Sequence, residues 1–479
     1  MFNRFALRRP RHIHIDLTEG SIKKHLFQLS YPMALGILAM MTFNLVDTFF
    51  ISFLGTNALA AIGFTFPIIM IMMGFFIGLG VGNNVLVSRA FGMHNHKKAA
   101  RYVTHGILLA VLIVFFFSLL GLLFQDQIFT FIGVPPEILG MVEAYMFPWF
   151  LGLIFMGLPT MTDKSLSAMG DTRTPAKIMI IAALLNIVLD PLLIFGVGPF
   201  PEMGIAGASW ATVFSRVVAT LSILFVLYRR QLISLYSKDF FSDMIESWKE
   251  MIRISLPTSF NTVTVHFVIL VLNKVMAAYG LAIIAGFGIA VKIEAFAAIM
   301  LLAVGESMPS FIGQNFGARR HDRIESALNY NAIFAICWSV ICFGLYHLIG
   351  TDIVSVFTQD AVVIRFALIY LIITSVSYSG VELMYASHSL FNSIDRSRYS
   401  VLFTIIQVLF IIICIYFGAH NYGAVGGILG LVMSRIIMGY IEFGYAKFLL
   451  YEDTDTGRFT YLKPHFIKHY VVREFRKRF

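Results

Sequence analysis

The chain has 479 residues, of which 58% are hydrophobic and only 13% are charged, and its formal net charge is +9. Soluble domains carry about 25% charged residues, so this composition excludes a chain that folds as soluble domains. The basic residues cluster between long apolar runs, which argues against nucleic acid as a partner and favours membrane lipid.

Apolar runs follow one another along the chain. A helix needs roughly 20 apolar residues to cross the hydrocarbon core of a membrane. The runs cover residues 31–54, 58–82, 102–124, 138–162, 175–196, 204–227, 256–279, 282–312, 327–349, 362–391, 399–417 and 424–450. We therefore predict an all-α membrane protein with twelve transmembrane helices. No short apolar core with a cleavage site precedes them, so we expect the first run to remain as a membrane helix.

The lysines and arginines predict an orientation. All but six of the 36 lie in the two terminal segments and in alternate loops, at 83–101, 163–177, 228–255, 313–326 and 392–398. Loops rich in lysine and arginine stay in the cytoplasm. We therefore expect a multi-pass protein of the inner (cytoplasmic) membrane with both termini in the cytoplasm. The six exceptions lie within helices: Arg216, Lys274, Lys292, Arg365, Arg435 and Lys447.

The two halves of the chain repeat each other. Four motifs recur in the same order and at a nearly constant spacing: LSYPMA at Pro32 matches ISLPTS at Pro257, SRAFG matches GQNFG, SAMGDTR matches NSIDRSR, and GIAGASWATVFSR matches GAVGGILGLVMSR. Each half holds six helices, so the halves insert the same way up and a pseudo-twofold axis runs along the membrane normal. The predicted segments are a cytoplasmic N-terminal segment (1–30), a first lobe (31–227), a cytoplasmic linker (228–255), a second lobe (256–450) and a basic cytoplasmic tail (451–479).

Polar residues inside the first lobe predict an ion site. A charged side chain inside the membrane costs at least a few kcal/mol and therefore indicates function. Asp47 lies deep in the first helix, and we expect Asn44, one turn earlier, to point to the same side. Asn186 and Asp190 share one face of the fifth helix, where Pro191 favours a kink that frees a carbonyl oxygen.

The sequence does not decide which ion binds. Desolvation and mutual repulsion raise the pKa of paired acids such as Asp47 and Asp190, so a proton can bind and leave as the site dries and hydrates. Oxygen ligands suit sodium equally well. We expect a proton or sodium as the coupling ion, with no other metal and no cofactor. Thr212 in the sixth helix offers another oxygen, although a lone membrane threonine usually bonds its own backbone.

The second lobe carries different chemistry. When the halves are aligned on the aspartates of SAMGDTR and NSIDRSR, Asn186 and Asp190 fall on Phe410 and Cys414. Lys292 and Glu294 are two positions apart on the same helix, so their side chains face different ways and each should pair with a residue elsewhere. Glu382, midway along the tenth helix, either contacts the substrate or coupling ion or forms an internal ion pair with a lysine. His266 and Lys292 are further candidates for such a contact, and His266 is alternatively a hydrogen-bonded core residue.

No catalytic pattern competes with transport. The glycines of GLGVGN at 78–83 lack a following Lys-Ser/Thr pair and lie within an apolar run, so they predict close helix packing rather than a phosphate-binding loop. An enzyme embedded in the membrane would need a paired nucleophile or a metal set at one depth, and the sequence offers neither.

Several motifs resemble those of the multidrug and toxic compound extrusion (MATE) family. They are FNLVDTFF, GTNALAAIGF, SRAFG, GDTRTP, NIVLDP and GIAGASWAT, and the resemblance extends over residues 20–450. Asn186-x-x-x-Asp190 together with Asp47 is similar to the branch named after DinF. The resemblance implies two six-helix bundles around a central cavity, and export of amphipathic, usually cationic aromatic compounds in exchange for protons or sodium.

The resemblance also implies roles for particular residues. In the DinF-like branch the first-lobe ion site includes residues that match Asp47, Asn186, Asp190 and Thr212. The NorM-like branch has a glutamate where this chain has His266, so a second-lobe cation site is in doubt. We expect a secondary antiporter that works as a monomer on small-molecule substrates held between aromatic and methionine side chains. A lipid-linked saccharide flippase and a major-facilitator transporter are the alternatives.

Overall fold

The computed structural model describes residues 15–233 and 240–456, and they form thirteen helices. The helices are α1 (Ile22–Ser52), α2 (Thr56–Gly92), α3 (His96–Ile132), α4 (Pro136–Leu151), α5 (Leu153–Ala168), α6 (Arg173–Phe195), α7 (Ile205–Arg229), α8 (Phe240–Ala277), α9 (Leu281–Gly317), α10 (His321–Ser355), α11 (Ala361–Ser375), α12 (Tyr378–Ser393) and α13 (Ser397–Thr456).

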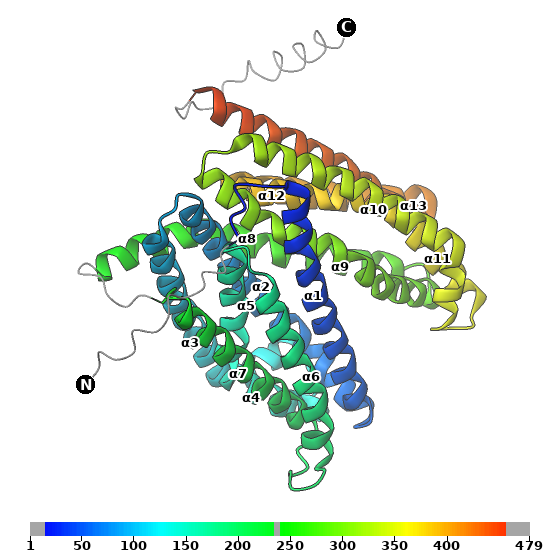
Figure 1. Ribbon diagram of the computed structural model, residues 1–479. Coiled ribbons are helices and arrows are strands. Elements are labelled where there is room, and N and C mark those ends of the chain that lie inside the picture. The colour runs from blue at the N-terminus through cyan, green and yellow to red at the C-terminus, as the bar shows by residue number, and fades with distance from the viewer. Residues whose placement is uncertain (1–14, 234–239, 457–479) are drawn as a thin grey trace.

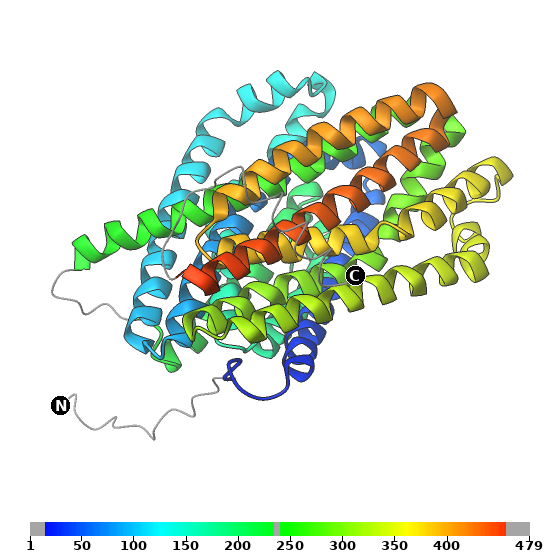
Figure 2. The same ribbon diagram turned by 90° about the horizontal axis from the view of Figure 1, so that it is seen from above.

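These helices make twelve membrane spans. The pairs α4–α5 and α11–α12 are each one span, bent by 52° and 47° at a short break. A straight helix as long as α13 would measure about 90 Å, three times the hydrocarbon core. It is broken at Tyr422 and Gly423, where Gly423 has a positive φ of 66°, and Figure 2 shows its two arms running antiparallel. The predicted count of twelve is confirmed.

Two lobes are visible in Figure 1, one built from α1–α7 and the other from α8–α13. They meet where α2 packs against α8 and α9. The contacts concentrate at the end of the bundle that carries the turns at 93–95, 169–172, 318–320 and 394–396, which we name the basic end. At the opposite end the helices of the two lobes diverge (Figure 1).

The predicted loops at the basic end are too long. α2 continues to Gly92 and α3 begins at His96, so only residues 93–95 remain of the predicted loop 83–101. Lys164, predicted in a loop, lies in α5, and α8 starts at Phe240 within the predicted linker. The helices continue because their polar residues have partners: Lys164 binds Glu306 of the other lobe at 2.7 Å. A pattern of hydropathy alone does not show such partners.

Glycines allow the lobes to touch. A Cβ atom on Gly78 would lie 2.7 Å from two backbone atoms, the Ser255 carbonyl oxygen and the Ser259 nitrogen, so this position admits no side chain. One on Gly82 would lie 2.2 Å from Ser255 Oγ, which would have to turn away. Close packing was the prediction for GLGVGN, and it is confirmed. Further along α2, Arg89 Nε donates to the Ser393 carbonyl of the second lobe at 2.7 Å.

The segment before α1, residues 15–21, ties the lobes together at the basic end. Leu17 is completely buried. Its N–H donates to Gln314 Oε1 at 3.0 Å, and its carbonyl accepts from Arg323 at 2.9 Å, both in the second lobe. The Ile15 N–H donates to the Met169 carbonyl of the first lobe at 3.2 Å. These bonds add to the closure of the basic end.

Asp171 organises the turn between α5 and α6. Its Oδ1 accepts the backbone N–H groups of Arg173 and Thr174 at 3.1 and 3.0 Å, and its Oδ2 binds Arg230. Burial raises the pKa of the Asp171 carboxyl, but the hydrogen bonds from Thr174 and Arg230 outweigh burial and hold the pKa below its ordinary value. A depressed pKa in the folded state means that ionised Asp171 stabilises the fold.

We expect Asp171→Asn to destabilise the protein by about 2 kcal/mol at pH 7, since the charge-assisted bond to Arg230 is lost. The stabilisation is present above the unfolded pKa of about 3.9 and disappears as the pH falls through the lower folded value. The melting temperatures of wild type and variant in detergent should therefore converge below pH 4. A difference that stays constant from pH 7 to pH 3 would contradict this role. Exposed Asp352→Asn serves as the control.

Candidate functional site

Three of the residues predicted for the ion site lie together between α6 and α7. Asn186 Nδ2 lies 3.2 Å from Asp190 Oδ1, one turn along α6, and 3.3 Å from Thr212 Oγ1 on α7. All three side chains are buried. The Thr212 hydroxyl oxygen therefore faces the Asn186 amide of the fifth span. α6 runs through Pro191 as one helix, and the predicted kink there stays a prediction.

Asp47 approaches this group from α1. It is buried, and its charge acts on Asp190 and on the hydroxyl of Tyr145. Among the described residues, no donor bonds Asp47 Oδ1, Asn186 Oδ1 or Asp190 Oδ2, although each atom is shielded from solvent. Two carboxylates cannot both stay charged in such surroundings without a cation or a proton. The arrangement is suited to binding either one.

Among the described residues, no hydrogen bond joins the Asn44 side chain to this group, and the prediction that it points to the side of Asp47 stays a prediction. Asn44 is exposed, whereas Phe43 is buried and lines a cleft together with Asn186. On a helix, a residue four positions earlier lies about 40° from Asp47 and a residue three positions earlier about 60° away, on the other flank. The edge of the buried face falls between these two positions.

The second-lobe candidates do not form one site. Glu382 is fully buried near Asn331 on α10, and neither of its oxygens is bonded by a described residue, so the predicted pairing with a lysine is absent there. Lys292 lies on α9, where its side chain is exposed. Glu294 does pair elsewhere, with Arg435 at 3.3 Å. His266 lies in α8, and its side chain lies outside the described residues.

Next to the ion-site residues, a cavity of about 140 Å³ lies in the first lobe, and Glu306 of α9 lines it from the second lobe. Its apolar wall includes four methionines, whose flexible side chains adapt to ligands of different shape: Met33, Met40, Met73 and Met179. No described aromatic residue lines it, and the prediction that substrates are held between aromatic and methionine side chains stays a prediction. Its charged wall combines two acids and two bases: Asp163, Lys164, Arg216 and Glu306.

Sequence reasoning missed this charged wall. Asp163 and Lys164 stand together at the end of an apolar run, where they resemble the start of a loop. In the structure Lys164 pairs with Glu306 across the lobes, and Asp163 Oδ1 is buried without a bond from a described donor. Glu306 could have revealed the wall in the sequence, because an acid within a long apolar run needs a basic partner.

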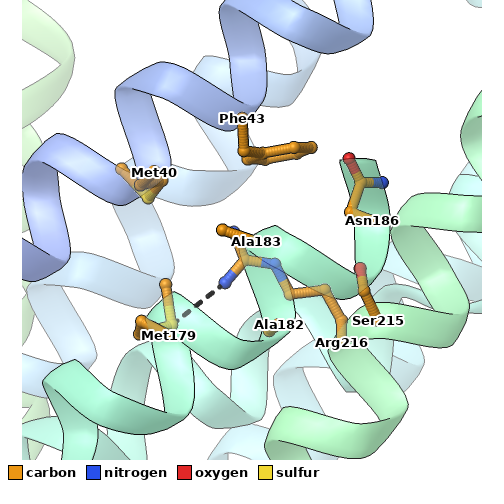
Figure 3. Close-up of a pocket in the computed structure, with 8 residues that line it drawn as sticks. All are labelled: Met40, Phe43, Met179, Ala182, Ala183, Asn186, Ser215 and Arg216. Carbon is orange, nitrogen blue, oxygen red and sulfur yellow. Dashed lines mark hydrogen bonds between the residues drawn. The ribbon is translucent and has the colours of Figure 1, made fainter. Parts of the chain in front are cut away.

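A smaller cleft of about 10 Å³ leads from the cavity toward Asn186. This is the room that roughly one water molecule needs. Figure 3 shows Arg216 reaching into it from α7, with Met40 and Phe43 of α1 opposite. Since Met40, Met179 and Arg216 line both spaces, these residues separate the cavity from the ion-site residues.

Comparison with known proteins decides the family. The MatE family model matches residues 32–192 and again residues 257–417. The chain belongs to the MATE family. The two matches begin at Pro32 and Pro257, the prolines that open the predicted repeat, so they reproduce its spacing. The internal duplication predicted from the sequence is therefore confirmed, and this MATE protein is a membrane transporter rather than an enzyme.

Relatives of known name cover most of this MATE chain. It is 29% identical over 425 residues to a FAD transporter of Shewanella oneidensis, covering 88% of this chain and 94% of the relative. It is 26% identical over 430 residues to the multidrug export protein MepA of Staphylococcus aureus, covering 87% and 92%. The Vibrio cholerae MATE transporter VcmN in the bent form has 25% identity and a TM-score of 0.85, covering 90% and 98%.

Proposed function

We propose that the protein is a secondary antiporter that exports amphipathic organic compounds in exchange for protons or sodium ions. The observation that supports this most is the group of unbonded, buried oxygens on Asp47, Asn186 and Asp190. A buried carboxyl pair that needs a cation or a proton is a device for coupling ion binding to hydration and hence to conformation. Thr212 completes the proposed ion site.

The arrangement of the lobes supports alternating access. The lobes are packed at the basic end and diverge at the other (Figure 1). By the distribution of lysine and arginine, we propose that the basic end and both termini face the cytoplasm and that the membrane is the inner one. The described conformation is then open to the outside, and export requires a second state in which the basic end opens.

The proposed substrates meet the wall of the cavity in the first lobe. Two named relatives carry different substrates in their names, FAD and multiple drugs. Cationic aromatic compounds are one proposed class, for which Asp163 offers an unbonded carboxyl oxygen on the cavity. A volume of about 140 Å³ is below the roughly 300–1,000 Å³ of usual ligand pockets. The cavity therefore holds one end of such a compound while the rest extends between the lobes.

Transport by purified protein in liposomes tests the proposal. We expect ethidium to move against its gradient when an opposing proton or sodium gradient is imposed, and to stop when that gradient is dissipated. Imposing the two gradients separately identifies the ion. Ethidium movement that is equally fast without any ion gradient would contradict antiport.

A further inference from the structure

Two arginines occupy repeat-related positions within the membrane. Arg216 on α7 and Arg435 on α13 end the matching motifs TVFSR and LVMSR. The structure preserves the local equivalence, because the serine before each arginine bonds the carbonyl three residues earlier: Ser215 to Thr212 and Ser434 to Leu431, both at 2.8 Å. The two arginines can therefore be compared directly, because their local backbone is the same and only their surroundings differ.

Arg435 is neutralised within the protein. Its Nη1 lies 3.3 Å from Glu294 Oε1, and the other oxygen of Glu294 accepts the Tyr370 hydroxyl at 2.7 Å. This arginine therefore has a partner in its own lobe and needs no ligand. When α9 is aligned with α2 on the repeated SRAFG and GQNFG motifs, Glu294 corresponds to Ile69, so the first lobe lacks the equivalent acid.

Arg216 is left without such a partner. Among the described residues, only the Met179 thioether accepts a hydrogen bond from it, at 3.4 Å, and the Phe43 ring lies 5.9 Å from its guanidinium carbon. A thioether is a weak acceptor, and a guanidinium has five N–H donors. No described carboxylate lies within 4 Å of Arg216, although the charge of Asp163 acts on it. Its donors face the two connected spaces (Figure 3).

An unpaired guanidinium within the membrane is costly and marks a site of function. A planar guanidinium favours an oxyanion that can accept two parallel hydrogen bonds, as a phosphate or a carboxylate does. We propose that Arg216 binds the phosphate or carboxylate of a transported compound at the wall of the cavity. This inference rests on the proposed export function and adds anionic compounds to its substrates.

Asp163 places a negative charge near the proposed oxyanion site. It lies on the same wall, near enough for its charge to attract Arg216 yet not in contact with it. In the absence of a ligand, Asp163 offsets part of the positive charge, and an incoming oxyanion competes with it. Because Arg216 also borders the cleft toward Asn186, a bound oxyanion lies between the cavity and the proposed ion site. Occupancy of one site should therefore influence the other.

Flavins provide a matched test, because riboflavin and flavin mononucleotide share one ring system and differ by a phosphate. We expect the purified protein to bind flavin mononucleotide about tenfold or more tightly than riboflavin, by flavin fluorescence anisotropy. Arg216→Gln should remove this difference, and Arg216→Lys should keep part of it. The control Arg365→Gln removes an exposed arginine on α11, away from the cavity, and should keep the full difference. Carboxyfluorescein, which lacks phosphate, shows whether a carboxylate also binds.

Several results would overturn the proposal. One is equal affinity of the wild type for both flavins with no binding of carboxyfluorescein. Another is a loss in Arg216→Gln that affects flavin mononucleotide, riboflavin and ethidium alike, which indicates an internal partnership with Asp163. Ethidium transport under an ion gradient separates the two proposals. If it persists while the flavins bind equally, only the oxyanion site is wrong. If ethidium does not move but flavin mononucleotide binds through Arg216, only antiport is wrong.

Discussion

Asp190→Asn is expected to reduce ion-driven export to background while the protein folds and inserts normally. The substitution keeps the size of the side chain and its bond from Asn186, but it removes the charge that attracts a cation and the group that takes up a proton. Asp47→Asn should have the same effect, since its carboxylate shares the buried region with Asp190. The measurement is ethidium efflux in liposomes under the ion gradient that drives the wild type.

Controls separate loss of coupling from loss of structure. Asp352 is exposed on α10, so Asp352→Asn should transport like the wild type. Thr212→Val removes one oxygen and leaves the carboxylates, and we expect a higher ion concentration for half-maximal transport rather than a loss of transport. Normal ion-driven export by the double variant Asp47→Asn, Asp190→Asn would overturn the assignment of the ion site.

The fold follows closely from sequence patterns. Apolar run length predicts twelve spans because a bilayer imposes one length on every helix that crosses it. The duplication is visible because Pro32 and Pro257 open their halves at the spacing that the family matches reproduce. A single physical constraint, repeated along the chain, leaves a pattern that needs no knowledge of tertiary contacts.

Which of the candidate ion-site residues lie close together could be predicted only in part. Asn186 and Asp190 are neighbours on one helix turn, so their proximity is local. Thr212 and Asp47 come from other helices, and the family resemblance rather than spacing placed them nearby. The exposure of Asn44 was less predictable, because a residue one turn away on a helix lies on either of two flanks, and only packing decides which flank is buried.

The cavity wall was not predictable because it depends on partners from separate elements. Lys164 looks like a loop residue until Glu306 is placed beside it. Arg216 and Arg435 look alike in the sequence and differ only in whether an acid stands across from them. Long-range pairing of charges determines these roles, and a single sequence does not record it.

Gly92 lies at the contact between the lobes, and adding a single methyl group there should strongly shift the protein between its two conformations. A Cβ atom there would lie 1.9 Å from the Gln314 carbonyl oxygen of the second lobe, a backbone atom that has no side-chain freedom to move away. We therefore expect Gly92→Ala to disfavour the packed basic end and to shift the protein toward the state in which that end opens. Export should fall because the cycle must pass through both states.

Distances across the opposite end measure this shift. Phe131 on α3 and Leu348 on α10 are exposed there, at 93% and 81%, and spin labels can be attached after Cys337, Cys342 and Cys414 are replaced. Gly92→Ala should shorten the distance between the labels. Gly63→Ala, on the same helix with nothing within 4 Å of the added atom, should leave the distance unchanged and stabilise α2 by about 0.5–1 kcal/mol. Equal distances in wild type and Gly92→Ala would mean that the lobe contact at Gly92 does not control access, because the clash would then have been absorbed within one lobe.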